Sequence, residues 1–127
     1  MRYKKFKSNQ IRLRNLDWKT SHKAKKGLII KLYDKHNLIG NCLIQDNWIY
    51  SLVINPKFRN QGYGSKLLKI AEKEILKKEK CVCLIPQDNK PNLRNFYSKN
   101  GFVGFSTTEQ LEHDGEKDYW LMWKDKQ

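Results

Sequence analysis

The amino-acid sequence predicts a single domain of the α+β class, in which a mostly antiparallel sheet of six to seven strands is combined with two helices. Three observations predict this fold. Apolar segments alternate with turn sequences in the first half, a helical repeat of apolar residues follows them, and shorter apolar segments flank a second helical stretch. The chain has 127 residues, of which 39% are hydrophobic. We therefore expect residues 1–127 to build one domain around one core.

The first half of the chain predicts an antiparallel meander. Residues 11–14, Ile-Arg-Leu-Arg, alternate between apolar and basic as a strand does, within an opening segment at residues 3–16. Three further apolar segments are separated by the turn sequences at 34–37 and 45–47. These predicted strands are Gly27–Tyr33, Leu38–Ile44 and Trp48–Ile54.

The pattern then changes from strand to helix. Apolar residues at helical spacing predict a helix from the loop at 62–65 to near Lys80. These residues are Leu67, Leu68, Ala71 and Ile75. A second helix is expected at Pro91–Lys99, because Asn100-Gly101 is typical of a helix end. The remaining strands are predicted at Cys81–Ile85, Phe102–Phe105 and Tyr119–Trp123.

The formal net charge of +13 indicates attraction to phosphate groups, in nucleic acid or in a nucleotide cofactor. Nucleic-acid binding is possible but not favoured, because lysine is spread along the whole chain and arginine is scarce. No run of about 18 apolar residues predicts a membrane span, and no apolar signal core follows the basic N-terminus. A cytoplasmic protein is therefore expected.

The three cysteines, Cys42, Cys81 and Cys83, are too few for a disulfide framework. One close pair without a second pair or a neighbouring histidine is a poor zinc site. We expect buried free thiols and no metal site.

A glycine-rich loop, Gly62-Tyr63-Gly64, leads from a predicted strand into a helix. The first N–H groups of a helix have no helical partners and carry positive potential, so this arrangement favours an anion, and Arg59 adds a fixed charge beside it. The loop lacks the Gly-Lys-Ser/Thr of a P-loop and the third glycine of a dinucleotide fingerprint. Taken alone, it is equally typical of a tight turn between a strand and a helix.

Two motifs together resemble the GNAT superfamily of N-acetyltransferases. The first is Arg59–Gly64, which is similar to the family's Arg/Gln-x-x-Gly-x-Gly/Ala loop. The second is Phe96–Phe102, which is similar to its Phe-Tyr-x-x-x-Gly-Phe pattern. They occur in the family's order, each in its expected element, and the resemblance covers about residues 48–105.

The resemblance implies acetyl-CoA as co-substrate and a role for each motif residue. Backbone N–H groups of the loop would hold the pyrophosphate, and the strand end at 52–54 would separate from the strand at 81–85 to admit pantetheine. A backbone N–H near Ile54 would polarise the acetyl carbonyl, and Tyr97 would protonate the departing thiolate. Asn89 or Asn92 would contact the cofactor arm. The implied cofactor-binding residues are Leu52, Val53, Ile54, Arg59, Asn60, Gln61, Gly62, Tyr63, Gly64, Ser65, Asn89 and Asn92.

The resemblance further implies a primary amine as acceptor, attacking directly in a ternary complex. The amine could be a small cationic molecule, a lysine side chain or a protein N-terminus. No acid on the strand at 48–54 offers a general base. The remaining candidates are Asp46, Glu109, Glu112 and His113, or an ordered water chain. An acidic cluster at 109–118, which contains Glu109 and Glu112, is interpreted as attracting the cationic amine, or as a solvated loop.

Residues 17–26 are too few for the family's usual pair of helices, which implies an open acceptor pocket or one that a partner completes. This departure and the missing base keep a second function open. The alternative is an inactive CoA-binding module that docks on nucleic acid or another protein through its basic surface.

Overall fold

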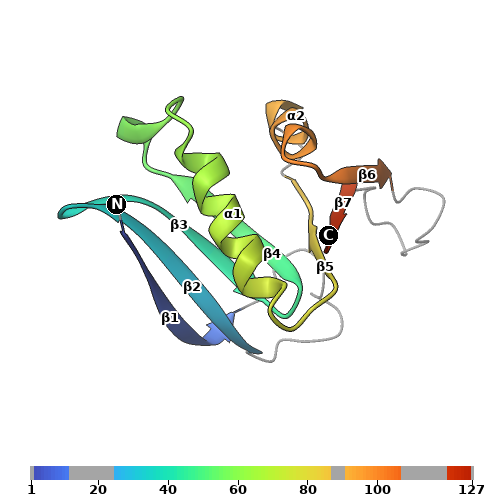
Figure 1. Ribbon diagram of the computed structural model, residues 1–127, viewed down its shortest axis with the longest axis horizontal. Helices are drawn as coiled ribbons and strands as arrows, with labels where there is room; N and C mark the ends of the chain where they lie inside the picture. The colour runs from blue at the N-terminus through green and yellow to red at the C-terminus, as the bar shows by residue number, and fades with distance from the viewer. Residues whose placement is uncertain (1, 12–24, 87–90, 107–119, 127) are drawn as a thin grey trace.

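The computed structural model describes residues 2–11, 25–86, 91–106 and 120–126, and Figure 1 shows the arrangement of their elements. Within these described ranges, seven strands form one sheet in the order β1-β2-β3-β4-β5-β7-β6, with two α-helices and a short 3-10 turn, η1. The elements are β1 (Arg2–Ile11), β2 (Lys25–Asp34), β3 (Asn37–Gln45), β4 (Trp48–Ile54), η1 (Pro56–Phe58), α1 (Tyr63–Ile75), β5 (Cys81–Leu84), α2 (Pro91–Lys99), β6 (Val103–Ser106) and β7 (Trp120–Asp125).

Strands β1 to β4 form an antiparallel meander, which confirms the meander predicted for β2 to β4. Strand β5 joins β4 in parallel, and β7 inserts antiparallel between β5 and β6. The predicted α+β class and the mostly antiparallel sheet of six to seven strands are confirmed.

The core lies between the sheet and α1, which crosses β3 and β4 in Figure 1. The apolar residues that predicted this helix are its buried residues: Leu67, Leu68, Ala71 and Ile75. The sheet meets them with alternate residues, because successive side chains of a strand point to opposite faces. Ile30 lies opposite Cys42 in the pairing of β2 with β3, and both are fully buried.

Strand β4 carries a β-bulge. Leu43 of β3 lies opposite Ser51, whereas the next residue, Ile44, lies opposite Ile49, so Tyr50 is the extra residue of β4. A bulge bends its strand and increases the local twist. The bend therefore falls between the part of β4 that pairs with β5 and the part that runs on toward the glycine-rich loop.

The predicted end of α1 was wrong by about five residues, and the predicted start of β6 by one residue. Helix α1 ends at Ile75, not near Lys80. The Lys78 N–H donates to the Ile75 carbonyl in a tighter, three-residue turn, and the chain then reaches β5 at Cys81. Strand β6 starts at Val103, because the Phe102 N–H bonds the carbonyl of Tyr97 and so belongs to the end of α2.

The alternating segment 12–14, the stretch from 17 to 24 and Tyr119 lie outside the described residues. Within the described part of the chain, no helix is long and apolar enough to cross a membrane.

Candidate active site

The loop after β4 is held to the strand end by its own side chains. The Asn55 side chain accepts from the N–H of Lys57 at 3.2 Å and donates to the Leu38 carbonyl at 3.3 Å. The Arg59 Nε donates to the Ile54 carbonyl at 3.1 Å. Arg59 therefore closes the loop back onto β4, and its remaining guanidinium N–H groups stay beside an exposed loop.

The backbone that opens α1 has the conformation of an anion-binding nest. Asn60 and Gly62 both have left-handed backbone, with φ of +62° and +84°. Gly62 is the N-cap residue of α1, and no side chain caps the helix. The first helical hydrogen bond runs from the Lys66 N–H to the Gly62 carbonyl, so the preceding N–H groups of the first turn point out of the helix end. Such concave N–H groups, together with the helix dipole, favour a phosphate.

Helix α2 packs against this first turn. A Cβ added to Gly64 would lie 3.3 Å from Cζ of Phe96, so only a residue without a side chain leaves the aromatic ring this close. The Asn100 Nδ2 donates to Ser65 Oγ at 3.3 Å and to the Phe96 carbonyl at 2.8 Å. The two family motifs, far apart in the sequence, therefore meet at the N-terminus of α1.

Tyr97 lies next to that contact, on α2, and is only 6% exposed. Its ring meets Phe96 and Phe102 edge-on, with centroids 5.1 and 5.8 Å apart. Burial, with a smaller contribution from nearby Cys42, raises the pKa of the Tyr97 phenol above its usual value near 10. The phenol is therefore protonated throughout the neutral range and can donate its proton or a hydrogen bond.

The parallel register between β4 and β5 covers only the first two residues of β4. Their parallel pairing joins Trp48 with Cys83 and Ile49 with Leu84. Strand β5 ends at Leu84, whereas β4 runs on to Ile54 at the start of the loop. Among the described residues, the stretch of β4 from 51 to 54 has β3 on one side and no register with β5 on the other.

Gly40 was not singled out from the sequence, yet it fixes the end of β4. It lies opposite Ile54 in β3, where an added Cβ would be 2.4 Å from the Val53 carbonyl oxygen. A side chain there would push the strand end away from its neighbour. The available signal was a glycine inside an apolar strand, which often marks a close backbone approach.

Of the remaining predicted site residues, the structure describes two and leaves four outside the described ranges. Asp46 is exposed in the turn from β3 to β4, at the opposite end of β4 from the loop. Asn92 is exposed in the first turn of α2. Asn89, Glu109, Glu112 and His113 lie outside the described residues.

The cysteines are free, as predicted, but only Cys42 is buried, so the prediction of buried thiols was wrong for the other two. Cys81 and Cys83 are half-buried, and both thiols accept from Asn47 Nδ2, at 3.4 and 3.5 Å. No group of three or more potential metal ligands occurs among the residues that the structure describes.

Solved structures share this fold at low sequence identity. An acetyltransferase of Bacillus subtilis in complex with CoA is 13% identical, with a TM-score of 0.63, over 80% of this chain and 78% of its own. The PaiA N-acetyltransferase of Thermoplasma acidophilum in complex with coenzyme A is 24% identical, with a TM-score of 0.61, over 77% and 60%. A mutant of the spermidine N-acetyltransferase SpeG of Vibrio cholerae is 18% identical, with a TM-score of 0.63, over 78% and 65%.

The chain thus spans less than two thirds of the length of the latter two proteins. No curated protein sequence matches it significantly. The family model of the GNAT acetyltransferase domain matches residues 25–104, from β2 into β6, which is more than half of the chain and includes the loop, both helices and Tyr97. The chain therefore belongs to the GNAT acetyltransferase family.

Proposed function

We propose that this protein transfers an acetyl group from acetyl-CoA to a primary amine, by direct attack in a ternary complex. The observation that carries the proposal is the left-handed, uncapped start of α1 beside the part of β4 after Ile49, which has no register with β5 among the described residues. The anion cradle, which consists of Asn60, Gly62 and the first turn of α1, meets this edge of β4. Tyr97 lies on α2, the helix that packs against the cradle. A tight turn alone would not require that combination.

The described residues fit the cofactor. The N–H groups of residues 61–65 would hold the pyrophosphate, with the Arg59 guanidinium beside them. Residues Leu52, Val53 and Ile54 would offer their strand edge to the amides of the pantetheine arm, as a sheet edge does to an added strand. Asn60 would contribute through its left-handed backbone, and Asn92 or Asn89 would contact the arm from the start of α2.

Acetyl-CoA supplies the acetyl group as a thioester, whose C–S bond breaks as the amine nitrogen bonds to the carbonyl carbon. A backbone N–H of β4 near Ile54 would stabilise the carbonyl oxygen as it gains negative charge, and one such donor is typically worth about 10²–10³ in rate. The Tyr97 phenol would give its proton, or a strong hydrogen bond, to the departing sulfur. The protonated amine gives up one proton before it attacks and a second as the amide forms. One of these protons restores the Tyr97 phenol and the other goes to a base or to water, so atoms and charges balance.

Cys42 lies near Tyr97, and its thiol shows how apolar surroundings change the pKa of a sulfur group. Burial raises the pKa of this thiol from 9.0 to about 12. A sulfur expelled into the same apolar surroundings would likewise gain affinity for a proton. The raised pKa of Tyr97 therefore does not disqualify the phenol, because donor and acceptor shift in the same direction.

The amine is a small cationic molecule, a lysine side chain or a protein N-terminus. The spermidine N-acetyltransferase among the structural neighbours supports a polyamine as the first compound to try. Asp46, Glu109 and Glu112 stay candidates for attracting the amine. Glu109, Glu112, His113, Asp46 or a water chain would receive its proton.

The experiment is a thiol-release assay with acetyl-CoA and a panel of spermidine, an aminoglycoside and a lysine-containing peptide. We expect release with at least one amine. We also expect Tyr97→Phe to lower kcat about 10²-fold, the lower range for a general acid, while acetyl-CoA still binds. Binding of acetyl-CoA without release on any amine would instead favour the inactive CoA-binding module. Absence of acetyl-CoA binding would refute both functions.

A further inference from the structure

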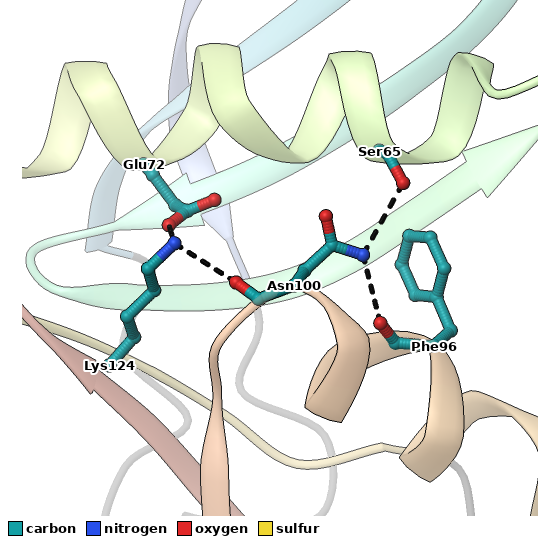
Figure 2. A network of polar contacts seen from close by, with 5 residues as sticks. All are labelled: Ser65, Glu72, Phe96, Asn100 and Lys124. Carbon is teal, nitrogen blue, oxygen red and sulfur yellow. Dashed lines mark hydrogen bonds and ion pairs between the residues drawn. The ribbon is translucent and has the colours of Figure 1, made fainter.

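A partly buried polar network joins α1, α2 and β7 behind the candidate site. Figure 2 shows Glu72 of α1, Lys124 of β7 and Asn100 at the end of α2 drawn together between the helices. The Lys124 ammonium lies 2.7 Å from Glu72 Oε1 and donates to the Asn100 carbonyl at 2.9 Å. Lys124 therefore binds one helix through a carboxylate and the other through the backbone of its C-terminus.

Stability alone is a poor explanation for this network. Glu72 is 6% exposed, and its Oε2 atom is buried without a hydrogen-bond partner among the residues that the structure describes. Removing a carboxylate from water is costly, and apolar replacements of buried ion pairs are often neutral or stabilising. A partly buried, incompletely satisfied pair suggests that the network fixes a geometry.

The geometry that it fixes is the end of α2, which carries Tyr97. The N–H groups of Gly101 and Phe102 bond the carbonyls of Ser98 and Tyr97, each at 3.0 Å, in a Schellman motif. Gly101 has a φ of +94°, and an added Cβ would lie 3.2 Å from Cε of Lys124. The Lys124 side chain thus packs directly against the turn whose hydrogen bonds end at Tyr97.

Two further contacts connect this turn to the phenol and to the anion cradle. The Lys124 ammonium lies 6.0 Å from the centre of the Phe102 ring, which itself packs edge-on against Tyr97. The Asn100 side chain binds Ser65 in the first turn of α1 and the Phe96 carbonyl, as Figure 2 shows. The turn is therefore held from β7 and from the cradle at once.

We propose that Lys124, held by Glu72, is a positioning residue that sets the Tyr97 phenol relative to the first turn of α1, with Asn100 as the link. This inference rests on the proposed function, because it assigns Tyr97 to the chemistry. Reacting groups tolerate little displacement, and a misplacement of about 1 Å can lower a rate about 10²-fold. Loss of the network should therefore lower the rate more than it affects cofactor binding.

The test is Lys124→Met, with kcat for the best amine of the panel and the Kd of acetyl-CoA measured by calorimetry. We expect kcat to fall at least tenfold and Kd to change less than about threefold, while Lys124→Arg recovers most of kcat. The matched control is Lys5→Met, which removes the 2.9 Å ion pair of Lys5 with Glu74 on the same helix. It should leave kcat unchanged. If Lys124→Met does not fold, the charge-free pair Glu72→Gln/Lys124→Met takes its place with the same expectation.

A double-mutant cycle separates the two proposals. If Lys124 acts through the phenol, Lys124→Met should lower kcat less than twofold in a Tyr97→Phe background. An equal fall in both backgrounds overturns the positioning role and leaves the function of Tyr97 intact. If Tyr97→Phe alone keeps full kcat, the proposed role of Tyr97 as proton donor is wrong. A fall in melting temperature with kcat unchanged also overturns the positioning role, because it identifies the network as purely structural.

Discussion

Replacing Gly62 by alanine tests the anion cradle most directly. Gly62 has a φ of +84°, and an added Cβ would meet no atom within 4 Å. The substitution therefore introduces backbone strain without a steric clash inside the protein. A left-handed backbone costs an alanine about 1–2 kcal/mol, which for a domain of this size corresponds to a fall of about 3–8 °C in melting temperature.

The same strain should weaken cofactor binding more than it weakens folding. Alanine favours negative φ, which would rotate the N–H groups around residue 62 out of the concave arrangement that Asn60 and Gly62 create. We expect Gly62→Ala to raise the Kd of CoA at least tenfold by calorimetry. In wild-type protein, CoA at about 100 times its Kd should stabilise the fold by about 2.7 kcal/mol, and the variant should lose half or more of that gain at equal CoA concentration.

Gly101→Ala is the matched control, because Gly101 has a similar φ of +94° but lies at the end of α2. It should lower the melting temperature by a similar amount and leave the Kd of CoA within twofold. The cradle is wrong if both variants bind CoA as wild-type does. It is also wrong if both weaken CoA equally, because the effect would then follow from general destabilisation.

Two further predictions concern stability around the site. Gly40→Ala should destabilise the protein by about 1–3 kcal/mol in urea unfolding and weaken CoA, because its Cβ would meet the backbone of Val53; wild-type stability would contradict the close approach. Alkaline pH should also destabilise the fold, because Cys42 has its pKa raised from 9.0 to about 12, so the unfolded chain loses this proton first. Between about pH 9 and pH 12, this thiol should lower the free energy of unfolding by about 4 kcal/mol. In urea titrations, Cys42→Ala should reduce the dependence of stability on pH. An unchanged dependence would show that the Cys42 thiol does not have a raised pKa in the folded protein.

Local sequence patterns predicted most of the fold, because in most elements the local preference of the residues agrees with the structure that the whole domain needs. The apolar residues of α1 recur at helical spacing and are the ones that the sheet buries. Asn100-Gly101 predicted the end of α2, where glycine provides the left-handed residue of the Schellman motif. The end of α1 was mispredicted because residues 76–80 include good helix formers, and the return to β5 is a tertiary requirement.

The parts of the site that escaped prediction depend on contacts between distant segments. Glu72 and Lys124 come from α1 and β7, and neither occupies a recognisable motif. A glycine inside the apolar strand β3 signals a close backbone approach at Gly40, but only the pairing of the strands identifies the end of β4 as the neighbour. The bulge at Tyr50 also escaped prediction. It arises from the way in which β4 pairs with β3, and the residues of β4 alone do not determine that pairing.

The short register between β4 and β5 inside the sheet is itself an argument for a ligand. A strand edge carries backbone N–H and C=O groups that normally have partners when they are buried. Most sheets place such edges at their rim, where water or charged side chains protect them. Here, among the described residues, the part of β4 after Ile49 has no strand paired on its β5 side although β4 lies in the middle of the strand order, beside a helix start that favours phosphate. A ligand with amide groups at one end and a pyrophosphate at the other satisfies both features, which neither a free phosphate nor an apolar ligand would do.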